Sequence, residues 1–237
     1  MNTLLLQSTR SGFGAAFLAL CLITGIAQAQ SMGEVIRSEN MPDFPPGTKI
    51  AEDSEIKTGD KQKIAIKTDQ GDVLIANQNA TIKLVKPGFF SHLFGKIYYF
   101  ISSRKDSSVS IQTATSTIGI RGTKFIIDTD QSDNSKERVS LVEGNLNFDS
   151  NDDELFQLYQ QRDLTEFELY RKQQMSEFQE FKQQMMEEFV AYKASIELGA
   201  GFALQFDGKK ATRVPLDEHV SSEIEEFERF VAASRLQ

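Results

Sequence analysis

The sequence predicts a mainly β protein with α-helical additions: an antiparallel β-sandwich or jelly roll, a long amphipathic helix, a short β-hairpin and a C-terminal helix. Two patterns predict this fold class. Between residues 49 and 148, short alternating apolar and polar runs are separated by turn residues about every 8–12 positions, as in β-sandwiches and barrels. From residue 152, aromatic residues recur every eleven positions, which is close to three turns of a helix.

Residues 1–29 have the pattern of a secretory signal peptide. An acid-free start with one Arg ("MNTLLLQSTR") precedes a short apolar run and the small-x-small site "AQA", so we expect the mature chain to begin at Gln30. The apolar run is shorter than the roughly 20 residues of a membrane helix, which disfavours a retained anchor. Lipidation of Cys21 is disfavoured because Leu20, not a small residue, precedes it. We therefore predict a periplasmic protein whose mature chain lacks cysteine, and hence disulfides and thiol chemistry.

The formal net charge of −8 comes from the C-terminal part of the chain. Residues 1–150 carry 16 acidic and 16 basic side chains, whereas residues 151–237 carry 18 acidic and 10 basic ones. Acidity of this kind argues against nucleic acid and anionic lipid surfaces as partners.

We assign residues 30–150 to the β domain. The stretch "DQGD" at Asp69–Asp72 separates two alternating runs and is a hairpin signal. The stretch "GFFSHLFG" departs from the alternation, and we expect it to form an apolar loop or a helical turn that caps the β core.

The stretch "STIGIRGTKFIIDT" changes parity within one expected strand. Ile118 and Ile120 would point to one face, whereas Phe125 and Ile127 would point to the other. We predict a β-bulge or strand bend at Arg121-Gly122, where the glycine permits unusual backbone angles.

Residues 151–196 are predicted to form one amphipathic helix about 65 Å long, because neither Gly nor Pro interrupts it. Its aromatic stripe could cover the β domain as part of the core, or it could mediate self-association or bind a partner. We favour the second interpretation, because the stripe is regular and too long for a small domain to cover. Membrane-surface binding is disfavoured, because the polar face is rich in Glu and Gln. The stripe comprises Phe156, Tyr159, Phe167, Tyr170, Phe178, Phe181, Phe189 and Tyr192.

The chain after this helix is predicted to form a β-hairpin over residues 197–216 and an amphipathic helix over residues 217–237. Asp207-Gly208 supplies the turn signal of the hairpin. Val220, Ile224, Phe227 and Val231 recur at helical spacing in the final segment.

Residue patterns that would indicate an enzyme are lacking. His92 and His219 are isolated in the sequence, and no His or Glu spacing suits zinc. "GIRGT" lacks the following Lys-Ser/Thr of a phosphate-binding loop, and the acidic loops lack the alternating pattern of calcium sites. We predict no cofactor and no metal, although paired carboxylates cannot be recognised from sequence because their pairing is spatial.

The β segment resembles the FecR domain family through "IKTGDKQKIAIKT" with "GDVLIANQNATIKL", "TATSTIGIRGTKFIIDT" and "VSLVEGNLNF". A weaker likeness covers "IELGAGFALQFDGKKATRVPL". The resemblance implies a signalling role, since the type member passes a signal from an outer-membrane receptor to a sigma factor. That role uses a cytoplasmic segment and a membrane helix, so we expect a stand-alone exported module here. The residues that match the motif are Thr113, Gly119, Arg121, Gly122, Thr123, Phe125, Glu143 and Gly144.

These observations lead to a predicted non-enzymatic periplasmic envelope protein. Its β domain would act as a binding or scaffold module, and its aromatic helix would make it a homo-oligomer or dock another envelope protein. A periplasmic sensor that reads a receptor or small ligand is the first alternative, and a glycan-active envelope enzyme is the second. We expect Arg121 to pair with Glu143, because the two motif strands should be neighbours. A straight helix is preferred over a helical hairpin bent near Asp163–Thr165, because no turn residue supports the hairpin.

Overall fold

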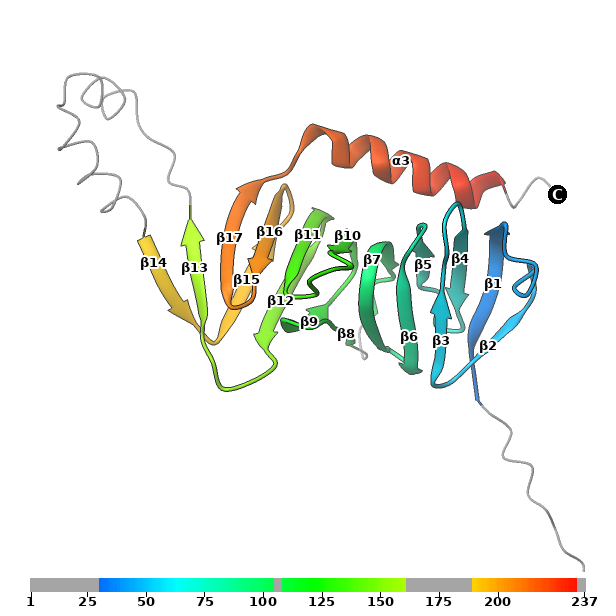
Figure 1. Ribbon diagram of the computed structural model, residues 1–237, viewed down its shortest axis with the longest axis horizontal. Coiled ribbons are helices and arrows are strands. Elements are labelled where there is room, and N and C mark those ends of the chain that lie inside the picture. Colours follow the sequence, from blue (N-terminus) through cyan, green and yellow to red (C-terminus); the bar gives the residue numbers. More distant parts are fainter. Residues whose placement is uncertain (1–29, 105–107, 161–188, 234–237) are drawn as a thin grey trace, which may run out of the picture.

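The computed structural model describes residues 30–104, 108–160 and 189–233 (Figure 1). Within these ranges, 17 strands form one hydrogen-bonded mixed sheet, and one helix, α3 (Glu218–Ala232), lies across it. The strands are β1 (Ser31–Glu39), β2 (Lys49–Ala51), β3 (Ser54–Lys57), β4 (Lys63–Thr68), β5 (Val73–Ala76), β6 (Thr81–Lys86), β7 (Phe89–Ile101), β8 (Val109–Gln112), β9 (Ser116–Ile120), β10 (Thr123–Thr129), β11 (Lys136–Glu143), β12 (Asn145–Ser150), β13 (Phe156–Gln160), β14 (Phe189–Lys193), β15 (Ser195–Gly199), β16 (Phe202–Asp207) and β17 (Lys210–Pro215).

The long strand β7 joins two branches of the sheet. Its second half pairs with β5 and β10, and the first branch runs β2-β1-β4-β5-β7-β10-β11-β16-β17-β13-β14. Its first half pairs with β6 and β8, and the second branch runs β3-β6-β7-β8-β9-β12-β15. The pairs β7–β8 and β13–β17 are parallel. The predicted antiparallel sandwich is therefore wrong as a fold class, because the sheet is mixed and continuous.

One apolar core lies between the two branches, and it follows the alternation of the strands. Phe125 and Ile127 of β10 are fully buried in this core, whereas Ile126 between them packs in a second cluster with α3. The predicted cap "GFFSHLFG" is also wrong, because all of it after Gly88 forms the first half of β7. Pairing with β6 and β8 gives this apolar segment partners that its own sequence could not reveal.

The parity change at Arg121-Gly122 is a strand bend, as predicted. Residues before it belong to β9 in the second branch, and residues after it belong to β10 in the first. Gly122 has φ +63°, and Gly144, which has φ +93°, stands at the matching passage from β11 to β12. A Cβ on Gly144 would lie 2.5 Å from the carbonyl oxygen of Gly122, so the two backbones touch at this corner. Only glycine satisfies both the backbone angle and the close approach.

The predicted continuous helix over residues 151–196 is wrong. Residues 156–160 form β13 and residues 189–193 form β14, and these strands pair antiparallel with Gln160 opposite Phe189. The two ends of the intervening segment are thus neighbours, which a straight helix could not achieve. Two patterns compete in this stretch of sequence. Phe156 and Leu158 alternate as buried residues of a strand do, whereas the aromatic spacing fits a helix. The segment forms a strand because it pairs in parallel with β17. Residues 161–188 lie outside the described residues, as do residues 1–29 of the predicted signal peptide.

The closing strands belong to the same sheet, and the final helix forms as predicted. β15 pairs with β12 and β16 pairs with β11. Figure 1 shows α3 running along the outward side of the first branch, from the β16–β17 end towards β1. Its buried face comprises Val220, Ile224 and Phe227, as predicted, together with Phe230, and the predicted Val231 is partly buried against the same cluster.

Helix α3 is also held by charges and aromatic contacts. Lys63 contacts Glu226 at 2.9 Å and lies 4.6 Å from the ring centre of Phe227, which stacks on Tyr98 at 5.6 Å. Lys96 pairs with Glu223 at 2.8 Å. Among the described residues, no helix is long and apolar enough to span a membrane.

Candidate functional site

The part of the outward sheet face that lies beyond α3 is hollowed into a groove of about 830 Å³. Its floor is a row of side chains that face one another across five neighbouring strands. Asp128 is opposite Arg138, Arg138 opposite Gln205, Gln205 opposite Thr212, and Thr212 opposite Tyr159. Because residues opposite each other on adjacent strands share a face, the five form one continuous polar surface.

A second row beside the first alternates in charge. Lys136 is opposite Asp207, and Asp207 is opposite Lys210. Asp130 lies beside Lys136, because its backbone N–H donates a hydrogen bond to the carbonyl oxygen of Lys136. We call the groove residues of both rows the outer groove. The two rows present three acidic and three basic side chains, and the lining of the hollow also includes the buried Glu137. Hydrogen bonds from Ser132 lower the pKa of the exposed Asp130. A general acid needs the opposite shift, so Asp130 does not suit that role, and the exposed charges of the two rows suit binding of a polar ligand.

A different set of polar groups is buried on the inner side of the same strands. Glu137 of β11 shares the inward face with Val139 and Leu141, and only 3% of its surface is exposed. Hydroxyl groups of Thr113, Thr115 and Thr129 face its carboxylate, but neither oxygen has a hydrogen bond of good geometry. Burial raises the pKa of Glu137 to about 7, and the three hydroxyls limit this rise. We call Glu137 and the three threonines the inner polar cluster.

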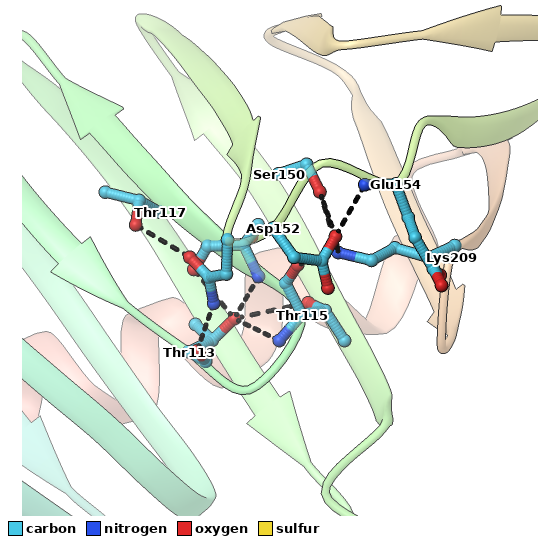
Figure 2. Close-up of polar contacts among 9 residues, drawn as sticks. Thr113, Thr115, Thr117, Ser150, Asp152, Glu154 and Lys209 are labelled. Atoms are coloured by element: carbon cyan, nitrogen blue, oxygen red, sulfur yellow. Dashed lines mark hydrogen bonds and ion pairs between the residues drawn. The ribbon is translucent and has the colours of Figure 1, made fainter.

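Thr113 builds the turn that delivers two of these hydroxyls. Its Oγ1 lies 3.3 Å from the amide nitrogen of Thr115 and 3.2 Å from that of Ser116, and both amides donate to it (Figure 2). Such a side chain-to-backbone turn fixes the connection between β8 and β9 at the end of the core.

Lys209 closes the core at this end. Its Nζ donates to Ser150 Oγ at 2.7 Å and to the carbonyl oxygen of Thr115 at 3.4 Å, and it pairs with Asp152 at 2.9 Å (Figure 2). The ammonium group also lies 5.4 Å from the ring centre of Phe156. One lysine from the β16–β17 turn therefore ties together the 113–116 turn and the segment that follows β12.

We call residues 151–155 the strap, because they cross from β12 to β13 over this end of the core. Asn151 fastens its start by donating to the carbonyl of Thr113 at 2.8 Å and accepting from Thr117 at 2.8 Å. Asp152 accepts from the amide of Glu154 at 2.9 Å. The strap itself is solvent-exposed, so these polar contacts rather than burial hold it.

A buried histidine lies on the other side of the inner polar cluster. Nε2 of His92 is 3.0 Å from the carbonyl of Gly95, so it carries the proton, and Nδ1 accepts from the Tyr99 hydroxyl at 2.9 Å. Burial lowers the pKa of His92 to about 3. Burial, with the nearby Glu137, raises the pKa of Tyr99 well above its ordinary value. Both groups are therefore neutral near pH 7, and His92 is a buried, hydrogen-bonded residue of the core.

The residues that match the family motif separate into two places. Thr113 belongs to the inner polar cluster, whereas Gly122, Gly144 and the buried Thr123 lie together at the strand bend. Phe125 stacks on Tyr99 at 5.1 Å in the core. These positions shape the sheet and do not form a cleft.

The remaining motif residues are Gly119, Arg121 and Glu143, and the two charged ones are exposed. Gly119 lies within β9, and Arg121 is exposed at the bend. The strands β10 and β11 pair as expected, but Glu143 contacts Lys124 at 3.3 Å. No ion pair joins Arg121 to Glu143 in the described part of the chain, because Lys124 is the residue opposite Glu143 in the register.

The expected aromatic stripe is not one surface. Phe156 is fully buried in the core, Tyr159 lines the outer groove, and Tyr192 is 65% exposed. Phe189 is described only as part of the backbone of β14. The other four members lie outside the described residues: Phe167, Tyr170, Phe178 and Phe181.

Sequence reasoning missed Glu137 and Lys209. A signal for Glu137 was present, because in "KERVSLVE" it falls on the same alternating face as Val139 and Leu141. An acid at an inward-facing position of a strand is unusual and marks a site to inspect. Lys209 carried no such signal, since its partners come from two distant turns. In the described part of the chain, no group of three or more His, Cys, Asp or Glu side chains could hold a metal ion.

Comparison with known proteins gives no family. No family model matches the chain, and no curated protein matches it. Two crystal structures of a candidate anti-sigma factor from Parabacteroides distasonis are similar in fold. One is 10% identical with a TM-score of 0.48 over 72% of this chain and 64% of that one. The other is 11% identical with a TM-score of 0.47 over 75% of this chain and 74% of that one. At these values the likeness assigns no function to this chain.

Proposed function

We propose that this protein is a non-enzymatic, exported binding module that holds a partner protein of the cell envelope in its outer groove. The observation that carries the proposal is the division of the outward sheet face. Helix α3 covers one part with apolar contacts, whereas the part beyond it is open, hollowed and lined by polar side chains of both charges. A monomer has no structural need for such a groove, and binding sites are usually concave.

The chemistry of the outer groove supports a polar segment of a partner protein as the ligand. Three basic and three acidic side chains can pair with charges of either sign, and Tyr159 adds an aromatic surface at the edge. Aromatic residues with a polar end are typical of protein interfaces, and complementary charges mainly confer specificity and rate of association. The groove lining contains Asp128, Asp130 and Asp207 and also the buried Glu137, and the lowered pKa of the exposed Asp130 gives no support to that residue as a glycan-cleaving acid.

Export to the periplasm is part of the proposal and rests on the signal-like residues 1–29. The sequence motif resembles that of FecR-type regulators. If the chain works as they do, the bound partner is a component of a signalling pathway. Self-association remains part of the proposal through the exposed edge near Tyr192 rather than through an aromatic helix.

Site-specific photo-crosslinking tests the proposal. A photoreactive amino acid in place of the exposed Gln205 should capture one protein in envelope extracts of the source cell. The double charge reversal K136E/K210E in the groove should abolish this capture. The control K57E/K67E makes the same change of net charge on β3 and β4, where both lysines are exposed, and should leave capture unchanged.

Two results would contradict the proposal. One is that no protein is captured through position 205, and the other is that both double variants reduce capture equally. Sedimentation of the purified mature chain separates a foreign partner from a second copy. A captured species of the same mass as the chain, together with a dimer in sedimentation, identifies the second copy.

A further inference from the structure

Strand β14 is an open edge of the sheet. It lies at the outer end of the first branch, as Figure 1 shows, and pairs antiparallel with β13 on one side. Within the part of the chain that the structure describes, no strand pairs with its other side. A strand at such an edge presents unpaired backbone N–H and C=O groups, so β14 can accept a further strand.

Three other strands also have a single neighbour among the described residues, and each is better protected than β14. β2 has only three residues, and β3 has four, with an ion pair between Lys57 and Glu55 at 2.8 Å. β15 carries the exposed Glu197 in its centre. In β14 the only charged residue is the last one, Lys193, and Tyr192 is 65% exposed. Because short length and charge are the usual protection of sheet edges, β14 is the edge left open to pairing.

We propose that β14 pairs antiparallel with β14 of a second copy of this chain. Overlap of all five residues places Ala191 at the two-fold axis and Tyr192 opposite Val190 of the second copy. Aromatic and β-branched residues at opposite positions stabilise antiparallel sheets. The inference deepens the self-association included in the proposed function, and it does not depend on what the outer groove binds.

The charge pattern of the sequence favours a second copy as the occupant of this edge. In "EEFVAYK", two glutamates precede β14 and Lys193 ends it. Antiparallel pairing brings the basic end of each strand to the acidic end of the other, whereas parallel pairing would bring like charges together. A two-fold pair is also closed, because each copy uses its unprotected edge and leaves none for a third copy. The assembly therefore ends at a dimer.

Pairing at β14 would extend the floor of the outer groove across the dimer. Lys210 is opposite Gln157, and Gln157 is opposite Tyr192, so the second row of the groove continues to the edge strand. The two-fold axis of an antiparallel pair stands perpendicular to the sheet, and both outer grooves would open to the same side. A partner with two equivalent binding segments would then gain affinity from both grooves at once.

Sedimentation velocity of the purified mature chain, without any other component, tests the dimer. A five-residue strand pair is a small interface, so we expect a reversible dimer that forms in the micromolar range. K193E should weaken dimer formation about tenfold, because it puts like charges at both ends of the pair. K67E makes the same change of charge at an exposed lysine of β4 and should leave the dimer unchanged. K136E/K210E should also retain the dimer, which separates this surface from the outer groove.

A disulfide tests the register of the strand pair. Residues 30–237 contain no cysteine, so A191C introduces a single thiol into each copy. With oxidised glutathione it should form a covalent dimer, because opposite residues of antiparallel strands lie within the Cα separation that a disulfide spans. The matched control K57C, on the edge strand β3, should remain monomeric on a non-reducing gel.

Three results would overturn the proposal. They are a monomer at every concentration in sedimentation, a dimer that K193E leaves unchanged, and a dimer that A191C crosslinks no better than K57C does. Should A191C not fold, sedimentation of the unsubstituted protein and of K193E decides. A dimer in sedimentation together with failed capture through position 205 would contradict the proposed partner of the outer groove and leave this inference intact.

Discussion

Replacing Glu137 with glutamine should change how the stability of the protein depends on pH. In the folded protein, burial raises the pKa of this carboxyl from 4.5 to about 7. The folded state therefore holds a proton that the unfolded chain releases. The stabilising contribution is complete below pH 4.5 and is lost as pH rises through about 7. Glutamine has the same shape but cannot ionise, so the loss should vanish in E137Q.

The size of the effect follows from the two pKa values of Glu137. A difference of one in pKa corresponds to about 1.4 kcal/mol, so the rise from 4.5 to about 7 corresponds to about 3 kcal/mol. The free energy of unfolding of the unsubstituted protein should fall by about this amount relative to E137Q between pH 4.5 and pH 8.5. Exposure of only 3% means that solvent screening reduces this figure little.

Urea unfolding of both proteins at a series of pH values measures the difference. The comparison between variants is essential, because His92 contributes in the opposite direction. Burial lowers its pKa from 6.5 to about 3, so its contribution is present above pH 6.5 and lost as pH falls. Both proteins contain His92, and its effect cancels when one stability curve is subtracted from the other.

A difference curve that varies by less than about 1 kcal/mol between pH 4.5 and pH 8.5 would refute this reasoning, because Glu137 would then titrate as an exposed carboxylate. A difference that grows with falling pH would also refute it, since that sign belongs to an acid with a lowered pKa.

Three further substitutions test the packing of the fold by urea unfolding. Gly144→Ala should lower the free energy of unfolding by more than about 2 kcal/mol, because its Cβ would lie 2.5 Å from a backbone oxygen. Gly208→Ala is the control, since φ is also positive there but nothing lies within 4 Å, and it should lower the free energy of unfolding clearly less. Equal losses in the two variants would contradict the close approach at Gly144. Phe227→Ala should cost about 3–4 kcal/mol through lost packing of α3 on the sheet, and a cost below about 1 kcal/mol would show that the helix is not docked in solution. Asp72→Asn should cost about 3 kcal/mol because it breaks the buried ion pair with Arg104, whereas a neutral result would mean that this pair is absent.

Local patterns were sufficient for several elements of the fold. The turn at Asp69–Asp72, the bend at Gly122 and the helix from Glu218 each carry their own signal in neighbouring residues. A positive φ with a close backbone approach favours glycine, and an N-cap followed by an apolar stripe at helical spacing is typical of a helix that packs on a surface. Such elements are readable because the physical requirement is met within a few residues of sequence.

Long-range pairing decided the elements that were predicted wrongly. Phe156 and Tyr159 fit a helical stripe by spacing, yet one lies in the core and the other in the outer groove, because β13 pairs with β17 and β14. The local helical preference of a short segment is worth only fractions of a kcal/mol per residue, and a ladder of strand pairs outweighs it.

The inner polar cluster also combines features set by local sequence with features set by long-range contacts. By itself, the sequence determined that Glu137 would point inward, because alternation along β11 fixes the face of every second residue. The chain also determined which groups are absent, with no cysteine beyond Cys21 and no metal-binding spacing. Tertiary structure alone decided that the hydroxyls of Thr113, Thr115 and Thr129 would gather near that carboxylate. The reason is physical: burial and proximity set its affinity for a proton, and both arise only when distant strands come together.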